Sequence, residues 1–387
     1  MKKLLLAVFS IATTFSLYAQ REVPQERMEQ IYEEVKTPYK YGLAVAPADN
    51  YHKIDCPTVF RQGDKWLMTY VVYNGKGGTD GRGYETWIAE SDNLLEWRTL
   101  GRVLSYRDGK WDCNQRGGFP ALPDMEWGGS YELQTYKGRH WMTYIGGEGT
   151  GYEAVKAPLY VGLAWTKGDI STAHEWESLD KPILSIHDKD AQWWEKLTQY
   201  KSTVYWDKDK TLGAPFVMYY NAGGHHPETN LKGERVGIAL SKDMKTWKRY
   251  SGNPVFAHEA DGTITGDAHI QKMGDVYVMF YFSAFEPSRK YKAFNTFAAS
   301  YDLVNWTDWK GADLIIPSKN YDELFAHKSY VVKHDGVVYH FYCAVNNAEQ
   351  RGIAIATSKP MGRSAVRFPA PELSLIHISE PTRRVVI

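Results

Sequence analysis

A cassette of short strands that occurs five times is the feature of this sequence that most constrains its fold. The first copy begins with Ile54-Asp-Cys-Pro-Thr-Val-Phe-Arg61 and continues, after a turn at Gly63, into Lys65-Trp-Leu-Met-Thr-Tyr-Val-Val-Tyr73. Both stretches are rich in β-branched and aromatic residues, which is typical of two strands joined by a hairpin turn. A Gly/Ala-rich third strand, a turn with Asp and a Trp before an outer strand complete the copy.

The second strand marks each copy most clearly, with its Trp/Tyr, Met and Tyr residues. It recurs at 66–70, 141–144, 216–220, 277–281 and 338–342. We assign the inner strand of the second copy to 131–136. Four-stranded units repeated at several tens of residues are typical of β-propellers. The sequence therefore predicts an all-β fold, a five-bladed β-propeller over 51–362.

Both ends of the sequence read differently from the repeats. Residues 1–19 have a basic start, an apolar centre and a small residue before Gln20, which predicts a signal peptide and a periplasmic or secreted protein. No Cys stands at the cleavage point, so we expect no lipid or membrane anchor. The lead-in over 20–50 includes a short amphipathic helix at 24–36. The tail, 363–387, breaks the pattern and is predicted to be non-native sequence that packs poorly.

The amino-acid composition limits the kinds of molecule that the protein is expected to bind. The protein has 46 basic and 46 acidic residues, so it offers no basic field for nucleic acid. Its 14 Trp and 27 Tyr fit packing between sheets and also stacking on sugars, and composition does not separate the two. Its three cysteines lack the spacing of a metal site, and we expect buried free thiols. We expect no cofactor, and a cation in the channel has no cluster of ligands to support it.

Ionisable residues stand near the start of every predicted inner strand. They are Asp55, Glu132, Lys201, Asp267, and His327 with Lys328. The first strand of each blade lines the central channel, where charged groups are costly unless they face a wet, functional pocket. The alternative is an internal salt-bridge network that plugs the channel.

Three motifs carry a resemblance to a known group. They are Ile54-Asp-Cys-Pro-Thr-Val-Phe-Arg61, Thr265-Gly-Asp-Ala-His269 and Ala326-His-Lys-Ser-Tyr330. With them, residues 45–360 resemble the five-bladed propeller glycoside hydrolases around families 43, 117 and 130. Family 43 has a Glu in the blade-three strand where this protein has Lys201. The pattern is more similar to family 117, which implies Asp55 as the base, with Asp267 and His327 completing the catalytic site.

The chemistry of inverting hydrolysis agrees with these roles. A base activates water and an acid protonates the leaving oxygen, with roughly 6.5–9.5 Å between them. His327 is the predicted acid because histidine titrates near neutral pH, whereas Glu132 or Glu195 would need strong desolvation. The predicted substrate-binding residues are Glu132, Lys201, Lys328, Arg61, Trp194 and His269.

The sequence thus predicts an exported glycoside hydrolase, exo-acting and inverting, on plant or algal oligosaccharides. One alternative is a glycoside phosphorylase of the family 130 kind, with phosphate held by Arg61, Lys201 and Lys328. The other is a non-catalytic carbohydrate-binding propeller.

Overall fold

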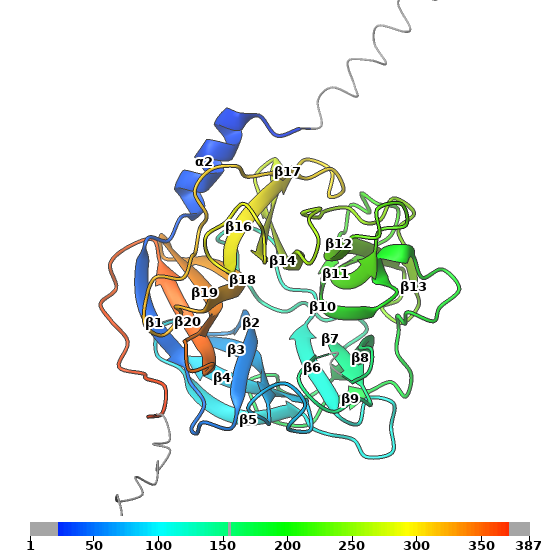
Figure 1. The fold of residues 1–387 in the computed structure, drawn as a ribbon, viewed down its shortest axis with the longest axis horizontal. Coiled ribbons are helices and arrows are strands. Elements are labelled where there is room, and N and C mark those ends of the chain that lie inside the picture. Colours follow the sequence, from blue (N-terminus) through cyan, green and yellow to red (C-terminus); the bar gives the residue numbers. More distant parts are fainter. Residues whose placement is uncertain (1–21, 154–155, 371–387) are drawn as a thin grey trace, which may run out of the picture.

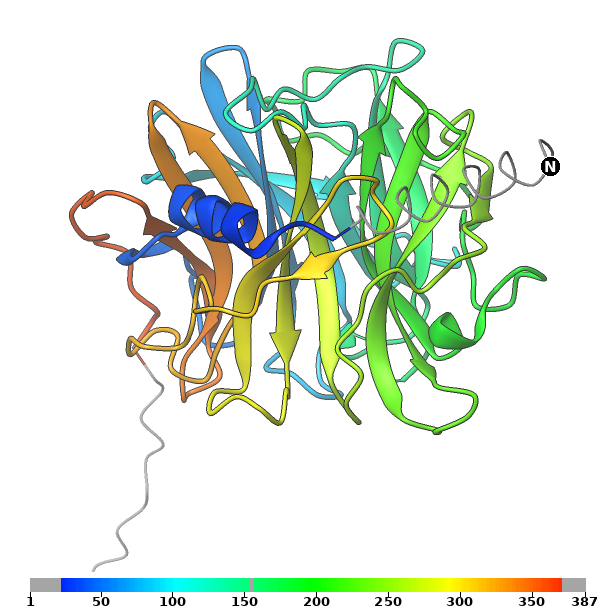
Figure 2. The ribbon, with the colours of Figure 1, turned by 90° about the horizontal axis from the view of Figure 1, so that it is seen from above.

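The structure is a computed structural model that describes residues 22–153 and 156–370 (Figure 1). The predicted signal peptide lies outside the described residues, as does the tail beyond Ala370. The predicted N-terminal helix is confirmed as α2 (Gln25–Val35). Its apolar face, with Met28, Ile31 and Val35, is buried against strands of the fourth and fifth blades. Figure 2 shows the helix lying across the outside of the ring.

The five-bladed propeller is confirmed, with its blades arranged around a central axis (Figure 1). The first blade consists of β2 (Lys53–Gln62), β3 (Lys65–Tyr73), β4 (Tyr84–Ser91) and β5 (Arg98–Leu104). The second consists of β6 (Gln115–Pro120), β7 (His140–Gly147), β8 (Tyr160–Thr166) and β9 (Glu177–Ser178). The third consists of β10 (Thr198–Trp206), β11 (Phe216–His225), β12 (Lys232–Ser241) and β13 (Trp247–Arg249), and the short helix η2 (Trp193–Glu195) precedes it.

The fourth blade consists of β14 (Ile264–Met273), β15 (Val276–Ala284), β16 (Ala293–Ser300) and β17 (Thr307–Asp308). It is joined to the third blade by one parallel bridge, between Glu234 and Ile264. The fifth blade consists of β18 (Phe325–His334), β19 (Val337–Val345), β20 (Arg351–Thr357) and β1 (Tyr39–Val45). Strands β2, β6, β10, β14 and β18 lie closest to the axis (Figure 1).

The predicted inner strand of blade two was wrong. Residues 131–136 lie in the connection between β6 and β7, and β6 (Gln115–Pro120) is the inner strand. Its Gln-Arg-Gly-Gly-Phe-Pro sequence lacks the apolar pattern of a strand, because its glycines admit close neighbours instead. A Cβ atom on Gly118 would lie 2.4 Å from the sulfur of Met142.

A second difference concerns the predicted lead-in. Residues 39–45 are the outer strand of blade five, where β1 pairs with β20 from Tyr39↔Thr357 to Val45↔Ile353. The two ends of the propeller thus close the ring together. The segment after β20 adds to this seam, because the Ser364 side chain is buried and donates to the Leu43 carbonyl. The rest of the predicted non-native tail, residues 371–387, lies outside the described residues.

A bulge near the start of four inner strands shapes one end of the ring. In β2, β10, β14 and β18 the pairing register shifts within the first residues of the strand. In three of them a non-glycine residue adopts left-handed backbone geometry, namely Cys56 (φ 52°), Asp267 (φ 57°) and Lys328 (φ 62°). Bulges re-aim side chains and are common beside active sites. Across residues 22–153 and 156–370, no helix is long and apolar enough to span a membrane.

Candidate active site

A cavity of about 190 Å³ opens at the end of the ring where the inner strands begin. The bulged residues Cys56, Asp267 and Lys328 line it, together with side chains from the connections between second and third strands. Lys201 and His327 also line the cavity, so five of the predicted site residues meet here once Asp55, directly beneath, is included. The predicted gathering of catalytic candidates at one end of the axis is thus observed.

Asp55 is completely buried at the floor of the site. Its Oδ2 atom accepts hydrogen bonds from Lys328 Nζ at 2.7 Å, Tyr152 Oη at 2.9 Å and Arg351 Nη1 at 3.1 Å. Burial alone would raise the pKa of Asp55, but the charges of Lys328 and Arg351 outweigh it and hold the pKa well below its usual range. Three donors thus engage Oδ2, and Oδ1 accepts from the Cys56 backbone N–H at 3.0 Å. The structure therefore favours a positioning role for Asp55 over the predicted role of base.

Two glutamates that the sequence analysis did not select face the cavity. Glu153, between β7 and β8, accepts from Lys328 Nζ at 3.0 Å, and its side chain is 29% exposed. Glu234, at the start of β12, accepts from Asn221 Nδ2 at 3.1 Å. Burial and the nearby charge of Glu153 raise the pKa of Glu234 to about 8. At neutral pH the pocket therefore presents a protonated carboxyl group and a second carboxyl group bound to a lysine.

Lys201 and Asp267 form a buried pair on the cavity wall, with 3.5 Å between Lys201 Nζ and Asp267 Oδ2. Neither atom has a hydrogen-bond partner in the structure. Burial raises the pKa of Asp267, partly offset by the charges of Lys201 and Lys328. Asn221 links this pair to Glu234, because its Oδ1 accepts from the Asp267 backbone N–H. Both atoms are closed to solvent, although the two residues line the cavity.

The predicted acid, His327, does not suit that role. Its ring lies between the rings of Phe282 and Phe325, each 5.5 Å away between centroids. Burial lowers the pKa of His327 to about 3, and the opposing effect of Asp55 is smaller. The imidazole is neutral at physiological pH and has no acidic proton to supply. The prediction considered a neighbouring carboxylate and not the apolar rings of Phe282 and Phe325.

One group of potential metal ligands occurs among residues 22–153 and 156–370, namely Asp55, His327 and Cys343. Their ligand atoms lie within 4.8 Å of one another. Lys328 and Arg351 already form ion pairs with the Asp55 carboxylate, and their positive charges would repel a bound cation. The group therefore does not fit a metal site.

Two predicted binding residues lie at the opposite end of the ring. Arg61 and Glu132 form a β-bridge there, next to the hairpin turn of β2 and β3. Glu132 is exposed and lines a separate hollow of about 620 Å³ with Asp124 and Asp207. Glu132 was assigned from the wrong inner strand of blade two. Arg61 was assigned from β2, but it stands at the end of that strand that is far from the cavity. Neither residue can contact a ligand in the cavity.

Two further predicted binding residues are buried structural groups. Trp194 is fully buried between blades two and three and donates its indole N–H to Gln192. His269 lies below the cavity, stacked on Tyr330 with 3.8 Å between ring centroids. Burial lowers the pKa of His269 to about 3. Neither side chain lines the cavity, because each packs inside the sheets instead.

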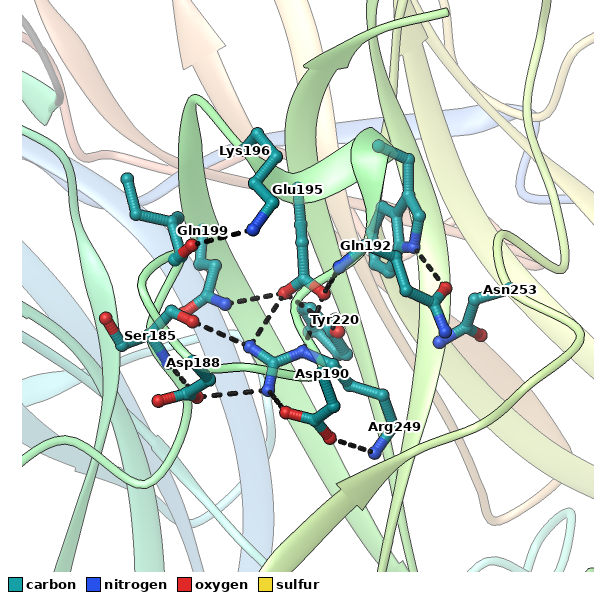
Figure 3. Close-up of polar contacts among 12 residues, drawn as sticks. Ser185, Asp188, Asp190, Gln192, Glu195, Lys196, Gln199, Tyr220, Arg249 and Asn253 are labelled. Carbon is teal, nitrogen blue, oxygen red and sulfur yellow. Dashed lines mark hydrogen bonds and ion pairs between the residues drawn. The ribbon is translucent and has the colours of Figure 1, made fainter. Parts of the chain in front are cut away.

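Glu195, the alternative acid, belongs to a buried ion network on blade three (Figure 3). Its carboxylate accepts from Arg249 Nε at 2.6 Å and from Gln199 Nε2 at 2.7 Å. Arg249 also pairs with Asp188 and Asp190, so one guanidinium fastens the segment before β10 to β13. This arrangement is structural, and Glu195 has no access to the cavity.

We expect Arg249→Met to destabilise the protein by about 3–5 kcal/mol, because Glu195 would keep its buried charge without a partner. Thermal unfolding measures the loss. Arg98→Met is the matched control, because Arg98 pairs with Glu90 at the surface and should change stability by about 1 kcal/mol or less. Equal, small effects of both substitutions would contradict a stabilising role for the network.

The fold and the cavity define a class of protein, a propeller enzyme with a carboxylate-lined sugar-sized pocket at one end of its axis. No family model matches the sequence, and the curated proteins contain no match. Two solved structures are 96% identical to it, with a TM-score of 0.90, and the alignment covers 91% of this protein and all of theirs. One is named a glycoside hydrolase, and the other is an RGII complex of BT0996.

The protein therefore belongs to the glycoside hydrolases. The predicted resemblance to the propeller glycosidases is confirmed. Among the distant structures is Zg3597, a family 117 glycoside hydrolase from Zobellia galactanivorans, at 12% identity and a TM-score of 0.58. That alignment covers 84% of this protein and 91% of the other, and it shows a shared fold. The non-catalytic alternative is set aside by the membership of the protein in an enzyme family.

Proposed function

We propose that this protein is an exported, exo-acting glycoside hydrolase that removes a terminal sugar from a plant or algal oligosaccharide, with inversion. We further propose an RGII oligosaccharide as a substrate, since the BT0996 structure, 96% identical to this protein, is an RGII complex. The observation that carries the proposal is the contrast between Glu234, whose pKa is about 8, and Glu153, bound to Lys328 in the same cavity. Two carboxyl groups in unequal environments are the minimal machinery of glycoside hydrolysis.

Glu234 acts as the acid in this proposal. Its O–H proton passes to the glycosidic oxygen while the bond from that oxygen to the anomeric carbon breaks. Glu153 acts as the base: it takes a proton from water as the water oxygen bonds to the anomeric carbon. The partial exposure of Glu153 lets water reach it, which activation of water by a base requires. Lys328 fixes the orientation of Glu153, and Asp55 fixes Lys328.

Exo action is supported by the small size of the cavity. Further along the inner strands β14 and β18, His269, Gln271 and Tyr330 are buried and packed together. A volume of about 190 Å³ suits one sugar unit and not a continuing polysaccharide. The paired residues Lys201 and Asp267 line the cavity and would lie beside this sugar unit.

We expect the purified protein to release a monosaccharide from the RGII oligosaccharide, first in the anomeric form opposite to that of the bond cleaved. Proton NMR during the first minutes identifies this anomer. An initial product with the original configuration would mean that Glu153 is a nucleophile and that the protein retains configuration.

The same reaction distinguishes hydrolysis from phosphorolysis. We expect no sugar phosphate when inorganic phosphate is added, because Lys201 is paired with Asp267, Lys328 with Asp55 and Glu153, and Arg61 is at the other end of the ring. A phosphate-dependent rate with a sugar phosphate product would replace the hydrolase with the family 130 alternative.

A further inference from the structure

The cavity lining combines two kinds of group. Tyr152, Glu153, Glu234, Lys328 and Arg351 are polar or charged. A second group, from blades four and five, is apolar and consists of Ile264, Phe282, Ala284, Phe285 and Phe325. The proposed hydrolysis uses polar residues and leaves this apolar group without a role.

Phe285 is the most exposed member of the apolar group. Its side chain lines the cavity, yet the residue is 49% exposed, the highest value among the large exposed hydrophobic residues that the structure describes. Leaving an aromatic ring half in water forgoes part of the stabilisation that its burial would give. A solvent-facing ring on the rim of a binding cavity is therefore a candidate contact for a ligand.

The backbone holds Phe285 in an unfavourable conformation. Its φ angle is +58°, which bulky side chains rarely adopt. The Phe285 N–H donates to the Lys292 carbonyl at 2.8 Å, so the loop between β15 and β16 closes directly behind it. Strained residues held in this way concentrate at ligand sites.

Phe325 supports this ring from blade five. The two rings meet edge to face, with 6.1 Å between their centroids and planes at 82°. Lys292 Nζ lies over the Phe325 ring at 5.6 Å from its centroid. Phe285 is thus fixed on both sides, by its own loop and by a neighbouring blade, while one part of the ring remains open to solvent.

We propose that Phe285, supported by Phe325, is the platform on which the sugar on the leaving-group side of the cleaved bond stacks. The inference rests on the proposed function, because the terminal sugar then occupies the inner part of the cavity, beside Lys201 and Asp267. A sugar joined to it must emerge at the rim, where Phe285 lies. Pyranose and furanose rings have an apolar face of C–H groups that an aromatic ring can cover. The protein would then select its leaving group by this contact.

The test compares two substrates that differ only in the leaving group. One is the RGII oligosaccharide, and the other is the glycosyl fluoride of the sugar that is released from it, whose fluoride cannot stack. We expect Phe285→Gly to lower kcat/KM on the RGII oligosaccharide about tenfold more than on the fluoride. Glycine is suitable because it adopts a φ of +58° without strain, so the loop keeps its geometry. Phe285→Tyr, which keeps the ring, should restore the ratio.

Tyr39→Ala is the matched control. Tyr39 is similarly exposed, at 46%, but lies on β1 and lines a different surface. It should leave the ratio of the two kcat/KM values unchanged. An equal loss on both substrates with Phe285→Gly, or no loss, would overturn the platform.

Failure of the proposed function looks different. The unmodified protein would then release no sugar from the RGII oligosaccharide. Calorimetric titration still tests the platform, because it measures the affinity of that oligosaccharide for the unmodified protein and for Phe285→Gly. A tenfold weaker affinity in the variant supports the platform. Equal affinities, or no binding to either protein, overturn it.

Discussion

Glu234→Gln is expected to lower kcat on the RGII oligosaccharide by about 10²–10⁴, because the amide has no proton to give to the leaving oxygen. The glycosyl fluoride of the same sugar should be largely spared, because fluoride leaves without being protonated. Comparing kcat on the two substrates is the measurement. Glu228→Gln is the control, because Glu228 is exposed in the connection that leads to β12. If His327→Ala shows the pattern expected of Glu234→Gln, and Glu234→Gln does not, the acid is the histidine.

The pH dependence provides an independent readout of the same group. The acid must be protonated, so kcat/KM should fall as the pH rises through about 8, the pKa to which burial and Glu153 raise Glu234. Below that pH Glu234 keeps its proton, and it does not limit the rate. The residual activity of Glu234→Gln should lack this alkaline limb. If the variant keeps the same fall in kcat/KM at alkaline pH, a group other than Glu234 causes that fall.

The second large effect is expected at Glu153. Glu153→Gln should lower kcat by about 10²–10⁴ with little change in thermal stability, because its side chain is partly exposed. Asp55→Asn should instead lower activity and stability together. It leaves Lys328 and Arg351 buried without their shared carboxylate, at a cost of about 3–5 kcal/mol.

Measuring kcat and the unfolding temperature of both variants separates the two roles. An inactive Asp55→Asn protein with unchanged stability, beside a normally active Glu153→Gln protein, would restore Asp55 as the base. Glu148→Gln serves as a control, because Glu148 precedes Glu153 in the same connection and is exposed.

The fold was largely predictable because the propeller repeats itself in sequence. The second strand of every blade, and the inner strands of blades one, three, four and five, follow from apolar runs, which burial between neighbouring blades requires. Blade two could not be assigned in this way. Its inner strand is defined by close packing at Gly118, and a missing side chain leaves no hydrophobic pattern to detect.

The site was predictable only in its location. Asp55, Asp267, His327 and Lys328 meet because the starts of inner strands must converge on the axis. Their charge states depend on three-dimensional surroundings, such as the phenylalanine rings around His327. Glu153 lies in a connection and Glu234 at the start of a third strand, so neither position belongs to the ring formed by the starts of the inner strands. An acidic residue at the beginning of a third strand, as in Lys232-Gly-Glu-Arg235, was the available signal.

The closure of blade five by β1 has a consequence for how the enzyme becomes active. Tyr39 pairs with Thr357, so the contacts that shut the ring join residues more than three hundred positions apart, and contacts of such long range form late in folding. Lys328 and Arg351, on the last blade to be synthesised, meet Asp55 of the first blade across the same junction. A nascent or partly unfolded protein can complete four blades and still lack an assembled active site. Catalytic competence therefore reports ring closure itself.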